Sequence, residues 1–169
     1  MATSPDAKVE LSLDLQWATS ADATPSSKQC ERWVTAALAG RRARAEVTLR
    51  LVDEPEGAEL NHRYRGRSGP TNVLSFPFEP PPGFDGDDLL GDLVLCAPLV
   101  AREAAEQHKS VEAHWAHLVV HGVLHLLGYD HQDSDAADSM ERLESLILHE
   151  LGFANPYEEP RSSDDERSI

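Results

Sequence analysis

The segment HGVLHLLGYDH, which covers residues 121–131, constrains this chain more than any other part of its sequence. His121 and His125 are four residues apart, so they lie on one face of a helix with 3.6 residues per turn. Gly128 follows them, and glycine ends a helix easily because it accepts a positive φ. After a turn of two residues, His131 can face the same point as the first two histidines. The segment therefore predicts a helix, a turn and three converging imidazoles.

Three neutral imidazoles that converge on one point are typical of a Zn²⁺ site with an open fourth position. Open positions are a feature of catalytic zinc, whereas structural zinc is usually enclosed by four protein ligands, most often cysteines. We therefore predict one zinc ion per chain, held by His121, His125 and His131. Asp130 is a candidate to orient a ligand by accepting its second ring N–H. The alternative for Asp130 is a turn residue that bonds its own backbone.

The same spacing of three histidines and a glycine occurs in the metzincin peptidases, and the comparison separates two chemistries. Metzincins carry a glutamate directly after the first histidine, where it acts as the general base. This chain has Gly122 there, which can neither accept a proton nor bind a metal. A zinc peptidase or related hydrolase is therefore the alternative, not the first hypothesis.

Two further histidines extend the same helical stripe toward the N-terminus. His114 is about two turns, or on the order of 10 Å, from His121, which is too far to share a metal with His125. We predict a structural role or a substrate contact for His114. His117 is one turn from His121 and is a candidate to support a ligand or contact substrate. For both residues, a packed core histidine is the interpretation we favour over these roles.

The net charge of −15 argues against non-specific binding to nucleic acids, which depends on lysine and arginine side chains near phosphates. Three arginines nevertheless lie close together in the segment NHRYRGRSG, with no carboxylate between them: Arg63, Arg65 and Arg67. A guanidinium group can hold two phosphate oxygens at once. The sequence therefore predicts a small basic site for a polyanion on an otherwise acidic protein.

Periodicity predicts an α+β fold, a single domain with a small mixed sheet packed with helices and the zinc site on the HxxxH helix and the following turn. Strands are predicted at 9–17, 45–52, 71–78 and from residue 91 until a helix begins near Pro98. Helices are predicted from residues 25–27 to Gly40, over 54–65, 99–108 and 111–127, and from Ser134 to about Leu151. The order of the strands cannot be read from the sequence.

The ends of the chain differ from its centre in composition. We predict a flexible N-terminus at 1–8, a folded domain at 9–157 and an acidic, disordered tail at 158–169. No apolar run approaches the roughly 20 residues that span a bilayer, and the N-terminus lacks the features of a signal peptide. With two cysteines that have no CxxC spacing, these features predict a cytoplasmic protein without a membrane segment.

Three runs of sequence carry a family resemblance: ELNHRYRGRSGPTNVLSFPFE, LLGDLVLC and AHWAHLVVHGVLHLLGYDH. Together they closely resemble the bacterial YbeY family of zinc-dependent endoribonucleases, also described as rRNA maturation factors, over about residues 9–157. The resemblance implies cleavage of single-stranded RNA, maturation of the 3′ end of 16S rRNA and a role in ribosome quality control. It also implies zinc ligands at His121, His125 and His131, and a functionally essential Arg65.

The resemblance implies precursor rRNA and ribosomal particles as partners, and the acidic surface is consistent with help from ribosomal or assembly proteins.

Zinc lowers the pKa of a bound water to about 7, so hydroxide or an activated RNA 2′-OH would attack phosphorus. Arg65 and the zinc would stabilise the charge that develops there. Arg63, Arg67, His117 and Asp130 are candidate supporting or substrate contacts. A general base is not identifiable, and a non-catalytic ribosome-assembly module remains a second alternative.

Overall fold

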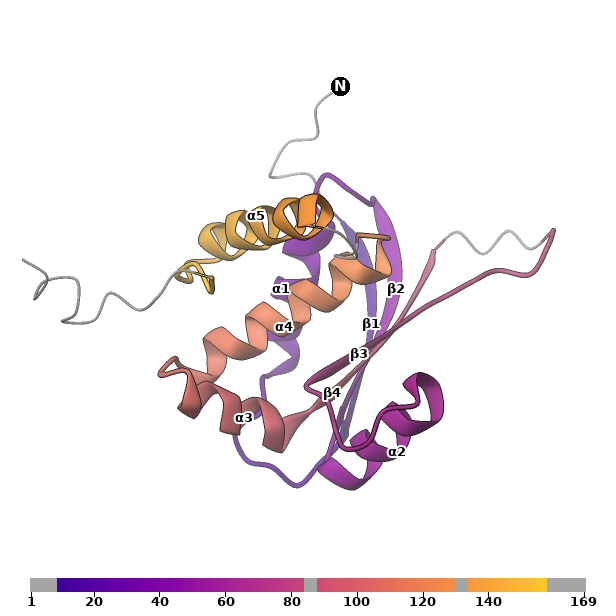
Figure 1. The fold of residues 1–169 in the computed structure, drawn as a ribbon. Coiled ribbons are helices and arrows are strands. Elements are labelled where there is room, and N and C mark those ends of the chain that lie inside the picture. Colours follow the sequence, from indigo (N-terminus) through magenta and orange to yellow (C-terminus); the bar gives the residue numbers. More distant parts are fainter. Residues whose placement is uncertain (1–8, 84–87, 130–133, 158–169) are drawn as a thin grey trace, which may run out of the picture.

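The computed structural model describes residues 9–83, 88–129 and 134–157 of the chain. Within these residues it has one sheet of four strands and five helices (Figure 1). In chain order the elements are β1 (Glu10–Ala18), α1 (Ser27–Leu38), β2 (Arg44–Val52), α2 (Glu54–Arg65), β3 (Val73–Pro77), β4 (Leu89–Cys96), α3 (Ala97–Glu106), α4 (Val111–Leu126) and α5 (Ser134–Glu150).

The sheet is mixed, as the sequence predicted, and its strand order is β1-β2-β4-β3. β1 pairs with β2 and β2 with β4 in parallel, whereas β3 runs antiparallel to β4. The predicted fold class, a single α+β domain, is therefore confirmed. β3 lies at one edge of the sheet, where it forms one wall of a cleft.

The predicted elements agree with the structure to within about two residues at most ends, which is the usual disagreement between assignments. β3 is shorter than predicted and begins at Val73. α3 begins at Ala97, two residues before the predicted start, because Pro98 fits the first turn of a helix. The predictions for residues 1–8 and 158–169 lie outside the described residues. None of the helices described is long and apolar enough to cross a membrane.

Helices cover the two faces of the sheet unequally. α1 and α4 pack on one face and build the main core with residues such as Trp33, Leu49 and Leu93. α2 lies on the other face, over a smaller cluster that contains Val52 and Val94. Figure 1 shows α5 lying along the outer side of α4, so α4 is enclosed between the sheet and another helix.

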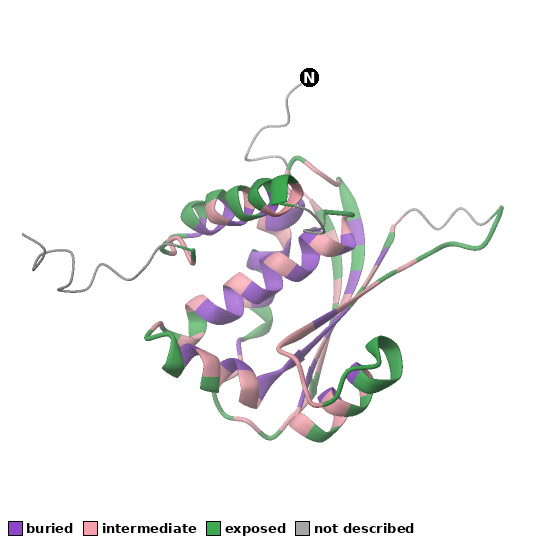
Figure 2. Ribbon diagram, viewed as in Figure 1, coloured by how far each residue is buried: buried purple, intermediate pink, exposed green. Residues whose placement is uncertain are grey.

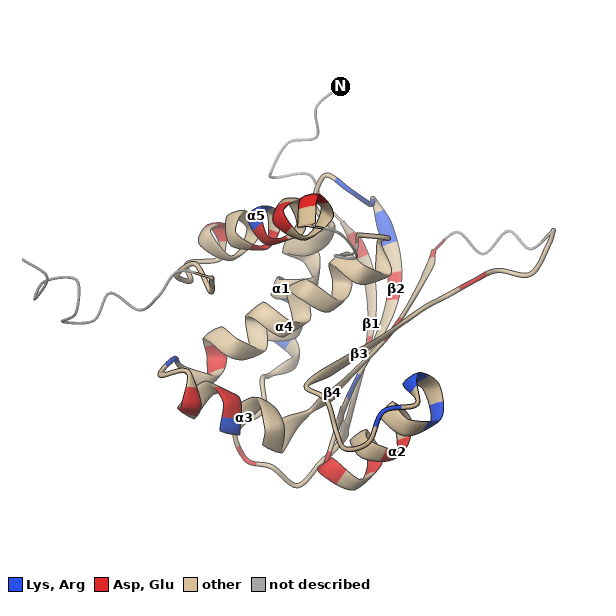
Figure 3. Cartoon of the chain, viewed as in Figure 1, with Lys and Arg blue, Asp and Glu red and all other residues tan. Residues whose placement is uncertain are grey.

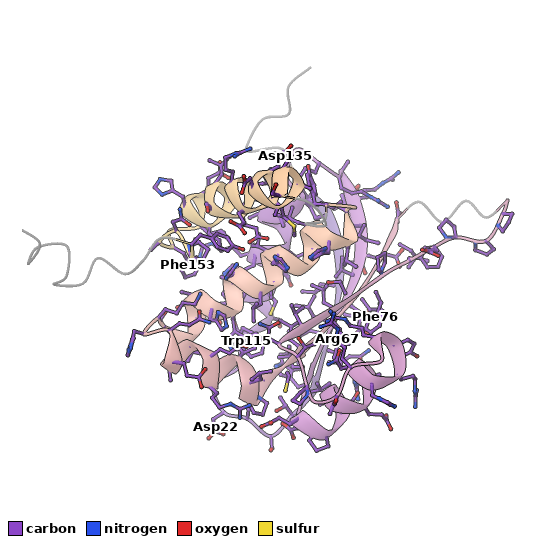
Figure 4. The ribbon with its side chains drawn as sticks, in the orientation of Figure 1. Asp22, Arg67, Phe76, Trp115, Asp135 and Phe153 are labelled. Atoms are coloured by element: carbon purple, nitrogen blue, oxygen red, sulfur yellow. The ribbon has the colours of Figure 1, made fainter. Side chains whose placement is uncertain are left out.

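α4 is the most deeply buried helix of the fold. Ser110 caps its N-terminus by accepting a hydrogen bond from the Ala113 N–H at 3.0 Å. Ten of its sixteen residues are buried, among them Trp115, whose indole N–H donates to the Ala23 carbonyl at 3.0 Å (Figures 2 and 4). A stripe of three histidines, His117, His121 and His125, remains partly exposed along one side of this helix.

Gly122 allows α4 to approach the sheet closely. A Cβ atom at this position would lie 2.7 Å from Cδ2 of Leu93, a buried residue of β4. The position that holds the general base in metzincins is therefore turned toward the sheet in this protein. A glutamate there would have to displace the packing between α4 and β4.

Replacing Gly122 by alanine tests this close approach. We expect Gly122→Ala to lower the free energy of unfolding by about 0–2 kcal/mol, because overpacking against Leu93 costs about 1–3 kcal/mol and alanine gains about 1 kcal/mol over glycine inside a helix. Denaturant unfolding would measure the change. Leu93→Ala should relieve the clash, so the double variant should lose less stability than the two single losses added together. A gain of about 1 kcal/mol in Gly122→Ala, the full effect of helix propensity with no cost of overpacking, would contradict the close approach.

Candidate metal centre and cleft

A cleft of about 790 Å³ lies between α4, the edge strand β3 and the last turn of α2. The three partly exposed histidines of α4 line it, and residues 71–77 line it from the side of β3. Tyr64 and Arg65 contribute from α2, and Tyr129 and Tyr157 from the segments that follow α4 and α5. The cleft therefore brings together residues from widely separated parts of the chain.

His121 and His125 already have the geometry of two ligands of one metal ion. Their Nε2 atoms are 3.1 Å apart, within hydrogen-bond distance of each other, and both residues line the cleft. Two nitrogens bound to tetrahedral zinc at about 2.0–2.1 Å lie roughly 3.3–3.4 Å from each other. The spacing of four residues on α4 thus brings two donor atoms to almost the separation that zinc requires.

Glu144 of α5 accepts hydrogen bonds from three residues beside the cleft, although its side chain is completely buried. His121 Nδ1–H donates to it at 2.5 Å, His117 Nε2 lies 3.2 Å from its carboxylate, and the Tyr157 hydroxyl also donates to it. Burial alone would raise the pKa of Glu144, but the hydrogen bonds from His117 and His121 outweigh burial and lower it to about 2. Glu144 is therefore a charged carboxylate at neutral pH.

The carboxylate fixes the orientation of His121. Because Nδ1 of His121 carries the proton that Glu144 accepts, its Nε2 keeps a lone pair directed toward His125. Metal-binding histidines commonly donate their second ring N–H to a carboxylate in this way. The residues present thus fit a metal ion coordinated by the two Nε2 atoms.

A second grouping of donor atoms shares His121. One donor atom each of His117, His121 and Glu144 lie within 4.8 Å of one another and could hold a metal ion. A metal ion there would have to replace hydrogen bonds that already use both oxygens of a fully buried carboxylate. We therefore interpret Glu144 as the residue that orients His121. The better metal site is the one formed by the Nε2 atoms of His121 and His125, which line the cleft.

Sequence reasoning missed Glu144, although a signal for it exists. α5 buries Met140, Glu144, Ile147 and Leu148, which share one face at helical spacing. A glutamate within an apolar stripe is unusual, because a buried charge needs partners. That pattern predicts a hydrogen-bonded carboxylate, but it does not say which residues are its partners.

His114 has a structural position. Its side chain is 3 % exposed, and its Nε2–H donates to Glu103 of α3 at 2.8 Å. Asn72, just before β3, donates to the same carboxylate oxygen at 3.0 Å. Burial lowers the pKa of His114. This network joins α3, α4 and the start of β3. His114 is therefore a packed, hydrogen-bonded residue of the interior.

The three clustered arginines differ in their positions. Arg65 ends α2 and lines the cleft, whereas Arg63 and Arg67 are not among the described residues that line it. Arg63 faces Glu59 of the same helix, with 3.8 Å between their charged atoms. Gly66 ends α2 in the left-handed conformation, with a φ of 67°. Figure 3 shows that basic residues gather at this end of α2.

The sequence profile of the family described as Endoribonuclease YbeY matches residues 14–152 of the chain. The chain belongs to the YbeY family. The resemblance seen in its motifs is therefore confirmed. The solution structure of TM1509 from Thermotoga maritima is similar over 86 % of this chain and 99 % of that chain, with 24 % sequence identity and a TM-score of 0.51. That likeness shows a shared fold.

The predicted site residues fall into two groups, those that the structure describes and those that it does not. His121, His125 and Arg65 line one cleft. His131 and Asp130 lie outside the described residues, so their predicted roles stay predictions. His117, a candidate support or substrate contact, lines the cleft and lies within hydrogen-bond distance of both Glu144 and Tyr157.

Glu144→Ala tests the importance of the buried carboxylate. Each buried donor left without an acceptor costs about 1–3 kcal/mol, but water can reach the partly exposed His121 and Tyr157. We therefore expect the metal-free variant to lose roughly 1–3 kcal/mol of unfolding free energy in total. Denaturant unfolding would measure it, with the exposed Glu141→Ala, one turn earlier on α5, as the matched control. Equal stability of the two variants would contradict the role assigned to Glu144.

Proposed function

We propose that this protein is a zinc-dependent endoribonuclease that cleaves single-stranded RNA during rRNA maturation. Membership of the YbeY family supports the reaction and the substrate class. The observation that carries the metal assignment is the 3.1 Å separation of the His121 and His125 Nε2 atoms in a cleft that also contains Arg65. We assign His131 as the third ligand, from its place in the sequence motif.

Each residue of the proposed site has a distinct task. His121, His125 and His131 hold the metal ion, and Glu144 keeps Nε2 of His121 available by accepting its Nδ1 proton. Zinc held in this way supplies a Lewis acid and a bound water whose pKa is about 7. Arg65 binds two oxygens of the scissile phosphate and stabilises the negative charge that grows on them during attack.

The acidic surface bears on how RNA reaches the site. The chain has a net charge of −15, so the protein as a whole repels RNA. Basic side chains gather at the end of α2, beside the cleft (Figure 3). We propose that ribosomal or assembly proteins bring precursor rRNA to this basic end, and that the protein acts on ribosomal particles in maturation and quality control.

The position of Gly122 argues against the peptidase alternative. The metzincin base would stand there, but a side chain at this position meets Leu93 in the core. Glu144 cannot replace that base, because it is fully buried and bonded to three donors. The partly exposed histidines of the cleft also differ from a closed structural zinc site, which disfavours a non-catalytic module.

The test is single-turnover cleavage of a single-stranded rRNA fragment, with metal content measured on the same samples. We expect Arg65→Ala to keep about one zinc per chain while cleavage falls by ~10²–10³-fold, the usual effect of losing one donor to developing charge. Arg65→Lys should rescue little, because an ammonium group cannot make a two-pronged contact. Arg63→Ala, outside the cleft lining, is the matched control and should change turnover far less.

Metal dependence is tested in the same assay. His125→Ala should lose both zinc and cleavage, and a chelator should abolish cleavage by the parent protein. Cleavage that survives complete removal of metal would overturn the metal mechanism. Near-normal cleavage by Arg65→Ala would remove this arginine from the reaction.

A further inference from the structure

All three tyrosines of the chain line the cleft that contains the histidines. Tyr64, Tyr129 and Tyr157 are 58 %, 39 % and 42 % exposed, and each comes from a different segment of the chain. The hydroxyl of Tyr157 donates to Glu144, which accounts for its position. Tyr64 has no comparable role in supporting the metal site. An exposed ring beside a phosphate-binding arginine therefore calls for another explanation.

The ring of Tyr64 packs against one neighbouring ring and remains exposed in the cleft. It meets Phe76 of β3 at 5.2 Å between ring centroids and an angle of 73°, an edge-to-face contact that covers at most one face. The guanidinium of Arg63 lies 6.0 Å from the Tyr64 centroid, near the outer limit of a cation–π contact. Because the Arg63 side chain is 59 % exposed, it can move away from the ring.

Tyr64 and Arg65 are adjacent at the end of α2, so one element presents an aromatic face and a phosphate-binding group together. We propose that Tyr64 is the stacking platform for one unpaired base of the RNA strand whose phosphate Arg65 binds. This inference rests on the proposed function and deepens it. Stacking needs a base that has left its helix, and it tolerates any base because every base has a π-face. Tyr64 therefore selects single-stranded RNA without selecting its sequence.

The experiment measures binding of a short single-stranded RNA to the metal-free protein by fluorescence anisotropy. We expect Tyr64→Ala to weaken binding about 5- to 150-fold, the effect of losing one base–aromatic stack. Tyr64→Phe and Tyr64→Trp should stay within a few-fold of the parent, because both keep a ring. The matched control is Trp17→Ala, which removes a ring that is 53 % exposed on β1 and lies outside the cleft lining.

Single abasic nucleotides placed at successive positions of the RNA identify the stacked base. At one position, the parent protein should lose as much affinity as Tyr64→Ala does, and Tyr64→Ala itself should lose nothing further. Abasic losses that add to the Tyr64→Ala loss at every position would overturn the inference. Binding by Tyr64→Ala equal to that of the parent would do the same, and comparison with Tyr64→Phe guards against a folding defect.

Failure of this inference can be distinguished from failure of the proposed function. If RNA cleavage depends on metal and Arg65 but not on Tyr64, only the stacking platform is wrong. If the parent protein neither binds nor cleaves RNA, both proposals are wrong.

Discussion

The close packing of α4 against β4 is the contact on which the rest of the structure depends. At Gly122 the helix comes so near the sheet that a single added carbon would meet Leu93 at 2.7 Å. This contact, with α5 on the outer side, buries most of α4 and leaves its histidine stripe as the part that faces the cleft. Interiors packed this densely change their arrangement only at a cost, so the donor atoms of His121 and His125 are held in position before any ligand binds.

The polar centre of the site is built into the same packed interface. Glu144 carries a negative charge between α4 and α5, where an isolated carboxylate would be strongly destabilising. Hydrogen bonds from His117, His121 and Tyr157 compensate for its burial. One carboxylate thus links the last described segment of the chain to the central helix and also orients a proposed ligand. The stability of the fold and the geometry of the site are therefore coupled.

Local patterns allowed much of the fold and part of the site to be predicted from the sequence. The spacing of His121 and His125 is a property of one helix, and the structure brings their Nε2 atoms to 3.1 Å. The strand order was not predictable, because it depends on pairing between distant strands. Glu144 was missed for the same reason, since 23 residues and a change of helix separate it from His121. Sequence proximity also grouped three arginines, of which only Arg65 lines the cleft among the described residues.

The most direct test of this account is a crystal structure of the zinc-loaded protein with anomalous scattering measured at the zinc absorption edge. Two groupings of donor atoms share His121, one with His125 and the other with His117 and Glu144, so the position of the zinc decides between them. We predict a peak about 2.0–2.1 Å from Nε2 of both His121 and His125, with Glu144 still bonded to Nδ1 of His121. A peak bonded to Nδ1 of His121, to His117 and to the Glu144 carboxylate would contradict the account.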